Sequence, residues 1–200
     1  MTFLFDIGRV LLDFDFESSL ARLFPSGTPD TAERLKRLLD RKDEFEAGKI
    51  DVDTYTDWAL GILEINATPA EFHHAWRQIF TPNEPMWKRV RQLKADGHRL
   101  ILFSNINGIH APWIYDEFPE FHLFDDAVFS FETGFIKPEP EIYHYAIDQH
   151  GVIPAETLYI DDLPQNAAAG RALGFHTWQY DLNEHAAFED WLSSKLKTEN

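Results

Sequence analysis

The chain of 200 residues is 44% hydrophobic and 14% aromatic, which is enough for one buried domain or for a core with a smaller inserted unit. Its 34 acidic residues outnumber its 18 lysines and arginines, and the net charge of -16 argues against nucleic acid and anionic membranes as partners. Because there is no cysteine, disulfides, thiolate zinc sites and cysteine nucleophiles are excluded. A small anionic substrate would need a local positive centre, such as a bound cation.

The stretch FLFDIGRVLLDFD, residues 3–15, places the carboxylate of Asp6 in apolar surroundings at the end of a predicted strand, residues 3–6. Burying an isolated carboxylate is costly unless a cation or hydrogen-bond donors meet it. The N-terminal segment has neither the basic n-region nor the apolar h-region of a signal peptide, and no run is long enough to span a membrane. We therefore expect a soluble cytoplasmic protein.

Residues 16–83 show apolar side chains at three- and four-residue spacing, which predicts a helical insert. Leu35, Leu38 and Leu39 form one expected stripe. The sequence TPAEF from Thr68 is typical of a helix start with a capping box. A glycine at position 48 fits the end of a helix, and its loop could reach over a site in the core. The chain is expected to return to the core through FTPNEP, near residue 83.

The remaining sequence alternates short apolar or β-branched runs with helical-length segments, which predicts βα units around a parallel sheet. The core is assigned to residues 1–15 and 84–200, with 16–83 as the insert. The predicted strands are residues 3–6, 99–104, 126–130, 157–160 and 175–179.

Polar residues follow these strands, where open parallel sheets bind their ligands. Taken singly, each could be a helix cap, a turn former or a surface lysine. Taken together, converging carboxylates favour a hard cation such as Mg²⁺, and a lysine, a hydroxyl and amides can hold a phosphate. The candidates are Asp6, Ser104, Asn105, Lys137, Asp161 and Asp162.

These residues lie in the segments FDIGRV, LFSN, GFIKPEPEIY and YIDDLPQNAAAGRALGF, which resemble, in order, the four motifs of the haloacid dehalogenase-like (HAD-like) hydrolases. The resemblance covers nearly the whole chain. It implies an α/β fold with a Rossmann-like parallel-sheet core and a small helical-bundle cap, inserted after the first strand at residues 16–83. It also implies a phosphatase that uses an aspartate nucleophile.

By this resemblance Asp6 attacks phosphorus and forms an aspartyl-phosphate that water then hydrolyses. The implied ligands of Mg²⁺ are Asp6, the backbone carbonyl of Gly8 and Asp161, with Asp162 beside them or just outside. The residues implied to hold the phosphoryl group are Ser104 and Lys137, with Asn105 adding an amide contact.

Within the family the chain is most similar to bacterial phosphatases that act on α-D-glucose 1-phosphate. The similarity rests on Gly8, on the segment FEAGKIDVDTY, and on the run Asn105, Asn107, His110 and Trp113. His110 and Trp113 are three apart on an expected helix, so they either contact the substrate or pack against neighbours.

Gly8 departs from the family pattern. Most family phosphatases have a second Asp there, which protonates the leaving group and deprotonates the attacking water, a role worth about 10²–10⁴ in rate. The substrate could have a leaving oxygen that needs little help, such as an anomeric oxygen, which is the outcome we favour. Otherwise Asp13 or His110 takes over the role, or turnover is lost and binding is kept.

The role of Arg9 and the class of reaction both stay open on the sequence alone. Arg9 either contacts the substrate or pairs with an acidic residue of the cap, Glu44 or Glu46. A metal-independent 2-haloacid dehalogenase would use Asp6 on carbon, but the acidic pair after the fourth core strand favours Mg²⁺. A catalytically silent binding or regulatory protein is favoured only by Gly8.

Overall fold

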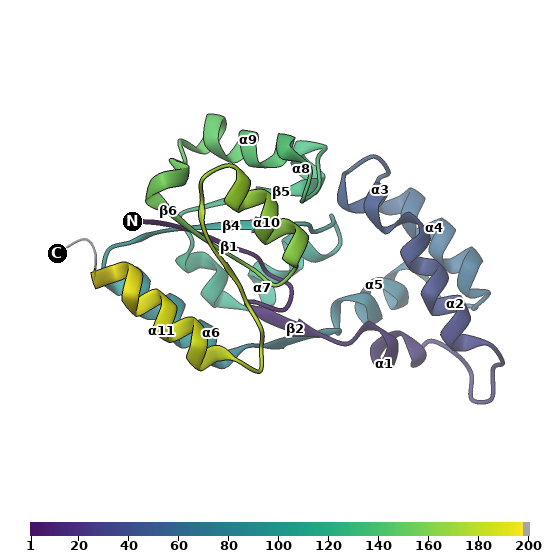
Figure 1. Ribbon diagram of the computed structural model, residues 1–200. Helices are drawn as coiled ribbons and strands as arrows, with labels where there is room; N and C mark the ends of the chain where they lie inside the picture. Colours follow the sequence, from purple (N-terminus) through teal and green to yellow (C-terminus); the bar gives the residue numbers. More distant parts are fainter. Residues whose placement is uncertain (198–200) are drawn as a thin grey trace.

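The computed structural model describes residues 1–197, and its centre is a parallel five-stranded sheet (Figure 1). The strand order is β5-β4-β1-β6-β7, so β1 lies in the middle with β4 and β6 on either side. This confirms the predicted fold class, and each expected strand is present with its ends shifted by at most one residue. The strands are β1 Thr2–Phe5, β4 Arg99–Ser104, β5 Asp126–Phe129, β6 Thr157–Asp161 and β7 His176–Gln179.

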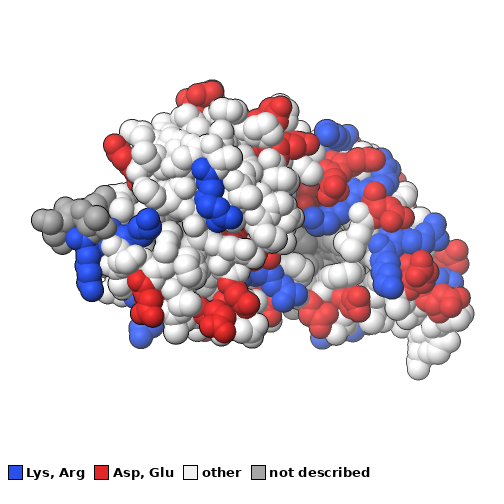
Figure 2. Space-filling view, in the orientation of Figure 1, with Lys and Arg blue, Asp and Glu red and all other residues white. Residues whose placement is uncertain are grey.

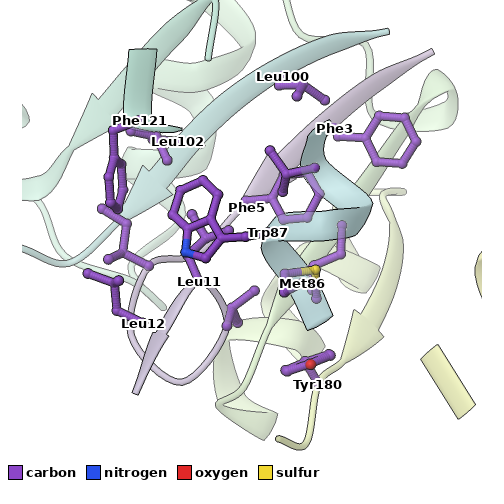
Figure 3. Packing of buried hydrophobic residues seen from close by; sticks show 14 of the residues in the cluster. Phe3, Phe5, Leu11, Leu12, Met86, Trp87, Leu100, Leu102, Phe121 and Tyr180 are labelled. Atoms are coloured by element: carbon purple, nitrogen blue, oxygen red, sulfur yellow. The ribbon is translucent and has the colours of Figure 1, made fainter. Parts of the chain in front are cut away.

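Successive residues of β1 point to opposite sides of the sheet, and they are apolar on both sides. Helices therefore cover both faces. Phe3 and Phe5 pack in one apolar cluster, and Leu4 packs in another. Figure 3 shows Trp87 of α6 lying against β1 and β4 in the first cluster. The elements on the first face are α6 Glu84–Ala95, α7 His110–Glu117, η2 Pro119–Leu123 and α11 His185–Leu196. The second face is covered by α9 Pro140–His150 and α10 Pro164–Ala172, with α8 Ser130–Thr133 and η3 Pro154–Glu156 in the connections.

A second group of helices lies beyond the carboxyl end of the sheet (Figure 1). We call them the cap helices: α1 Phe16–Ala21, α2 Thr31–Arg37, η1 Leu38–Arg41, α3 Lys42–Glu46, α4 Val52–Leu63 and α5 Pro69–Arg77. They share an apolar cluster of their own, to which the core contributes Ile109. The expected stripe is only partly correct: Leu35 and Leu38 are buried, but Leu39 is 44% exposed because the chain tightens into a 3₁₀ turn at Leu38.

Two short strands connect the core with the cap helices. β2 Leu12–Phe14 pairs antiparallel with β3 Phe80–Pro82, so the outgoing and returning chains run side by side. The sequence suggested only a return near residue 83, because three-residue strands carry no detectable periodicity. Buried Asn83 secures the return by donating from Nδ2 to the carbonyl of Val10 at 2.7 Å and to the hydroxyl of Tyr180 at 3.0 Å. In the described part of the chain, no helix has the length and apolarity needed to cross a membrane.

Candidate active site

Three adjacent strands bring polar side chains to one edge of the sheet. Asp6 follows β1, Ser104 ends β4 and Asp161 ends β6. Lys137, which follows α8, inserts its side chain among them and is only 3% exposed. Its Nζ lies 3.0 Å from Oδ1 of Asp6 and 2.6 Å from Oδ2 of Asp161, and it donates to the carbonyl of Phe103 at 2.7 Å. Strand order therefore brings together residues up to 155 positions apart, counting from 6 to 161.

Asn105 holds the backbone of Lys137 in place. Its Oδ1 accepts from the Lys137 amide at 2.8 Å, and its Nδ2 donates to the Lys137 carbonyl at 3.0 Å. Burial alone would lower the pKa of Lys137, but the nearby carboxylates of Asp161 and Asp6 outweigh this effect and raise it. The lysine therefore remains a fixed cation at the carboxyl end of the sheet.

Three carboxylates lie around this point, with one oxygen each from Asp6, Asp161 and Asp162 within 4.8 Å of one another. Burial, opposed by Lys137 and reinforced by Asp161, raises the pKa of Asp6 to about 6. Burial together with Asp6 and Asp161 raises the pKa of Asp162 to about 7. A hard divalent cation would favour the ionised form of all three, and an all-oxygen donor set fits Mg²⁺.

The two neighbouring acids differ in their surroundings. Asp161 is fully buried and accepts four hydrogen bonds, from Lys137, the Tyr159 hydroxyl, the Leu163 amide and Asn166. Within residues 1–197 no other residue donates a hydrogen bond to the carboxylate of Asp162. The lone pairs of Asp161 are thus largely used inside the protein, whereas the carboxylate of Asp162 has its own backbone amide as a hydrogen-bond donor and keeps lone pairs for a cation.

A cavity of about 130 Å³ lies where the core meets the cap helices. Its core side is formed by Gly8 and by the segment from Ser104 to Asn107, and its other side is mostly aromatic. Figure 2 shows the surface hollowed between these two parts. The residues that the cap helices contribute include Lys42, Phe45, Glu46, Tyr55 and Trp76.

The sequence matches the haloacid dehalogenase-like hydrolase family over residues 1–174. The chain belongs to this family. A D-ribitol-5-phosphate phosphatase from Bacteroides thetaiotaomicron is 29% identical over 88% of this chain and 89% of its own. A sesquiterpene phosphatase from Aspergillus oryzae is 30% identical over 66% of this chain and 68% of its own. These matches confirm the predicted enzyme class, the HAD-like phosphatases.

A solved HAD family enzyme from Bacteroides thetaiotaomicron has a TM-score of 0.81 and 25% identity, covering 92% of this chain and 94% of its own. Another structure of that enzyme, at 24% identity and a TM-score of 0.79, is a complex with magnesium and inorganic phosphate. The magnesium belongs to that protein; for this HAD-like hydrolase the family match and the cluster of Asp6, Asp161 and Asp162 agree with the predicted Mg²⁺.

In this HAD-like hydrolase Gly8 faces an aromatic ring. A Cβ at position 8 would lie 3.3 Å from the ring of Phe14, so Phe14 occupies space that a side chain would need. Arg9 pairs with Asp13 at 3.1 Å and stacks over Phe14, with its guanidinium 4.8 Å from the ring centre. The pairing of Arg9 with Glu44 or Glu46 is therefore not formed, and neither Arg9 nor Asp13 lines the cavity.

His110 lines the cavity, yet both of its ring nitrogens are engaged. Nδ1 lies 3.2 Å from Nδ2 of Asn107, and Nε2 lies 3.0 Å from the carbonyl of Trp76 in α5. Burial lowers the pKa of His110 to about 4, so the ring is neutral and donates from Nε2. Trp113 packs against Phe80. Both side chains are thus held by neighbouring residues of the protein.

The sequence did not predict that α3 of this HAD-like hydrolase contributes charged residues to the cavity. Lys42 and Glu46 line the cavity, and their charged atoms lie 2.8 Å apart. The sequence indicated Glu46 as a partner for Arg9 and as part of the segment FEAGKIDVDTY, without a role of its own in the site. Opposite charges at positions i and i+4 would have signalled the pair, but not its position over the site.

Proposed function

We propose that the protein is a Mg²⁺-dependent phosphomonoester hydrolase that works through an aspartyl-phosphate on Asp6. The observation that carries the proposal is the meeting of Asp6, Lys137 and the acidic cluster at the carboxyl end of β1. Asp6, the carbonyl of Gly8 and Asp162 would hold the magnesium, which when bound supplies positive charge for the phosphate and keeps Asp6 ionised. Asp161 would mainly orient Lys137.

In the first half-reaction an Oδ atom of Asp6 forms a bond to phosphorus, and the bond from phosphorus to the leaving oxygen breaks. Lys137 and the Ser104 hydroxyl stabilise the charge on the transferring phosphoryl oxygens. In the second half-reaction the oxygen of a water molecule bonds to phosphorus, and the Asp6 carboxylate is released. Asn105 contributes by fixing Lys137.

The substrate we propose is a small sugar phosphate, with α-D-glucose 1-phosphate as the best candidate. Because position 8 offers no carboxyl group, a leaving oxygen that is acidic by itself, as an anomeric oxygen is, needs the least help, whichever other residue supplies the proton. The relative from Bacteroides thetaiotaomicron is named for D-ribitol 5-phosphate, which supports a small polyol or sugar ester of phosphate. We also propose that residues 16–83 act as a cap that covers the bound substrate.

A phosphate ester of an apolar alcohol is the second candidate. The cavity is lined by several aromatic rings, among them Phe14, Phe45, Trp76 and Phe80, which favour apolar surface. The relative from Aspergillus oryzae is named as a sesquiterpene phosphatase. Aromatic rings also stack on sugar faces, so a direct comparison of substrates is needed.

The test is release of inorganic phosphate from α-D-glucose 1-phosphate, D-glucose 6-phosphate, D-ribitol 5-phosphate and farnesyl phosphate, with and without Mg²⁺. We expect Mg²⁺-dependent release, fastest with glucose 1-phosphate, and its loss in Asp6→Asn. A marked preference for glucose 6-phosphate contradicts the anomeric argument, and a preference for farnesyl phosphate supports the second candidate. Chloride release from 2-chloropropionate without metal would indicate a dehalogenase, and binding without turnover would indicate a silent protein.

A further inference from the structure

Two proton transfers in the proposed reaction have no assigned residue. An alkoxide leaving oxygen must gain a proton, and the attacking water must lose one whatever the leaving group is. Gly8 offers no side chain. Asp13 is turned toward Arg9 outside the cavity, and His110 is held neutral with both nitrogens engaged.

Glu46 is a buried carboxyl group in the same cavity. It is the last residue of α3, is 8% exposed, and lines the cavity together with Gly8 and Ser104. Within residues 1–197, Lys42 is the one residue paired with its carboxylate. A buried carboxyl group is costly to ionise, and one that lines the same cavity as Gly8 and Ser104 is a candidate for a role in the chemistry.

The chain just after Glu46 is docked on the core. Gly48 has a φ of +65°, and a Cβ there would lie 2.2 Å from the carbonyl oxygen of Phe131 in α8. Figure 1 shows α3 lying next to α8. Ser130, which begins α8, exchanges hydrogen bonds with the backbone of Ile106, close to Ser104. Backbone contact thus positions the end of α3 over the carboxyl ends of β4 and β5.

We propose that Glu46, delivered by the cap helices, is the proton donor and acceptor that replaces the acid missing at Gly8. This inference rests on the proposed function. While Asp6 bonds to phosphorus, the leaving oxygen takes the proton of the Glu46 carboxyl group. In the second half-reaction the Glu46 carboxylate takes a proton from the attacking water, whose oxygen bonds to phosphorus as the Asp6 carboxylate departs. Glu46 is then protonated again, and the cycle is complete.

The charge environment of Glu46 supports this role. Burial raises the pKa of Glu46 to about 7, against the opposing effect of Lys42 and with smaller contributions from Asp43 and Asp6. Tyr55 is the other titratable neighbour, and its hydroxyl donates to the carbonyl of Leu38. The effect of burial on the pKa of Glu46 is the same whether or not a cation is bound at the acidic cluster. A carboxyl group with a pKa near neutrality can both give and take a proton.

The experiment compares Glu46→Gln with the wild-type protein on two leaving groups, in the presence of Mg²⁺. With D-ribitol 5-phosphate, whose alkoxide needs a proton, we expect kcat to fall about 10²–10⁴-fold. With 4-nitrophenyl phosphate, whose phenolate leaves unaided, we expect a burst of one nitrophenolate per enzyme followed by slow turnover, because only hydrolysis of the aspartyl-phosphate needs the base. Glu46→Asp should restore part of both rates.

The matched control is Glu44→Gln, an exposed carboxylate on the same helix that pairs with Arg41. It should leave both rates and the burst unchanged. In Lys42→Met the ionisation in the pH profile of kcat should move to higher pH, because the opposing cation is gone. A Glu46→Gln variant with unchanged kcat, or with a raised KM alone, overturns the inference and leaves the proposed function standing. Wild-type protein that releases no phosphate from any ester overturns both.

Discussion

At the scale of single residues, the two adjacent acids after β6 are chemically alike but differently engaged. Asp161 shares its oxygens among four donors, one of which is Lys137, whereas Asp162 has lone pairs to spare. The family motif contains both residues together. The hydrogen bonds separate them into an acid that orients Lys137 and an acid that is free to bind the cation.

This difference predicts distinct effects of two isosteric changes. Asp162→Asn should weaken apparent Mg²⁺ affinity at least about 10-fold and leave kcat at saturating Mg²⁺ much less affected. Asp161→Asn should lower kcat even at saturating Mg²⁺, because it weakens the hold on Lys137. Titrating phosphate release against Mg²⁺ for both variants measures the two effects. The reverse pattern would show that Asp161 is the main cation ligand.

At the scale of elements, Gly48 is where a cap segment meets α8. Gly48→Ala combines an unfavourable left-handed backbone with a clash against the Phe131 carbonyl. We expect it to lower kcat/KM for sugar phosphates about 10-fold or more, because α3 and Glu46 would be displaced. Gly27→Ala is the matched control, since Gly27 has a φ of +83° but open space around it. Equal losses of activity in the two variants would refute a special role for the docking contact.

The start of α5 provides a test of local stability. Thr68 Oγ1 accepts from the Glu71 amide, and the Glu71 carboxylate accepts from the Thr68 amide at 2.7 Å, which confirms the expected capping box. Thr68→Ala should lower the free energy of unfolding by about 1 kcal/mol. Chemical denaturation measures this loss of free energy, and Thr68→Ser should retain most of the stability. An unchanged midpoint in Thr68→Ala would contradict the prediction.

At the scale of the whole molecule, the acidic cluster links stability, pH and magnesium. In the metal-free protein, the raised pKa values of Asp6 (about 6) and Asp162 (about 7) mean that the folded state binds their protons more tightly than the unfolded state does. Their contribution to stability is fully present below the unfolded pKa of 3.8 and is lost as pH rises through 6 to 7. Magnesium requires the ionised carboxylates.

We therefore expect Mg²⁺ to stabilise the protein more at about pH 8 than at about pH 5. At a concentration one hundred times Kd the gain at the higher pH is about 2.7 kcal/mol, which is about 5–10 °C in Tm for a chain of this size. Thermal melting in Mg²⁺ and in EDTA at both pH values measures it, with Asp6→Asn as the control. A larger shift at the lower pH would be inconsistent with these carboxylates as the cation ligands.

The sequence by itself determined the fold class, the family and the identity of the strand-end residues. These signals are local: Asp6, Ser104 and Asp161 each directly end an apolar run, and a parallel sheet brings such ends to one edge. The capping box at Thr68 is local in the same way, since its two residues are three positions apart. The choice of α-D-glucose 1-phosphate as substrate remains a prediction.

Only the tertiary structure decided which group lies opposite Gly8. Phe14 fills the space beside Gly8, Arg9 turns to Asp13, and α3 brings Glu46 into the cavity. The position of Glu46 depends on how the cap helices pack on the core, to which β2, β3 and the contact at Gly48 contribute. The contact between Gly48 and Phe131 joins residues far apart in the chain, so no periodicity or motif spacing indicates it. The missing acid was visible in the sequence, and its proposed replacement became visible only when the chain was folded.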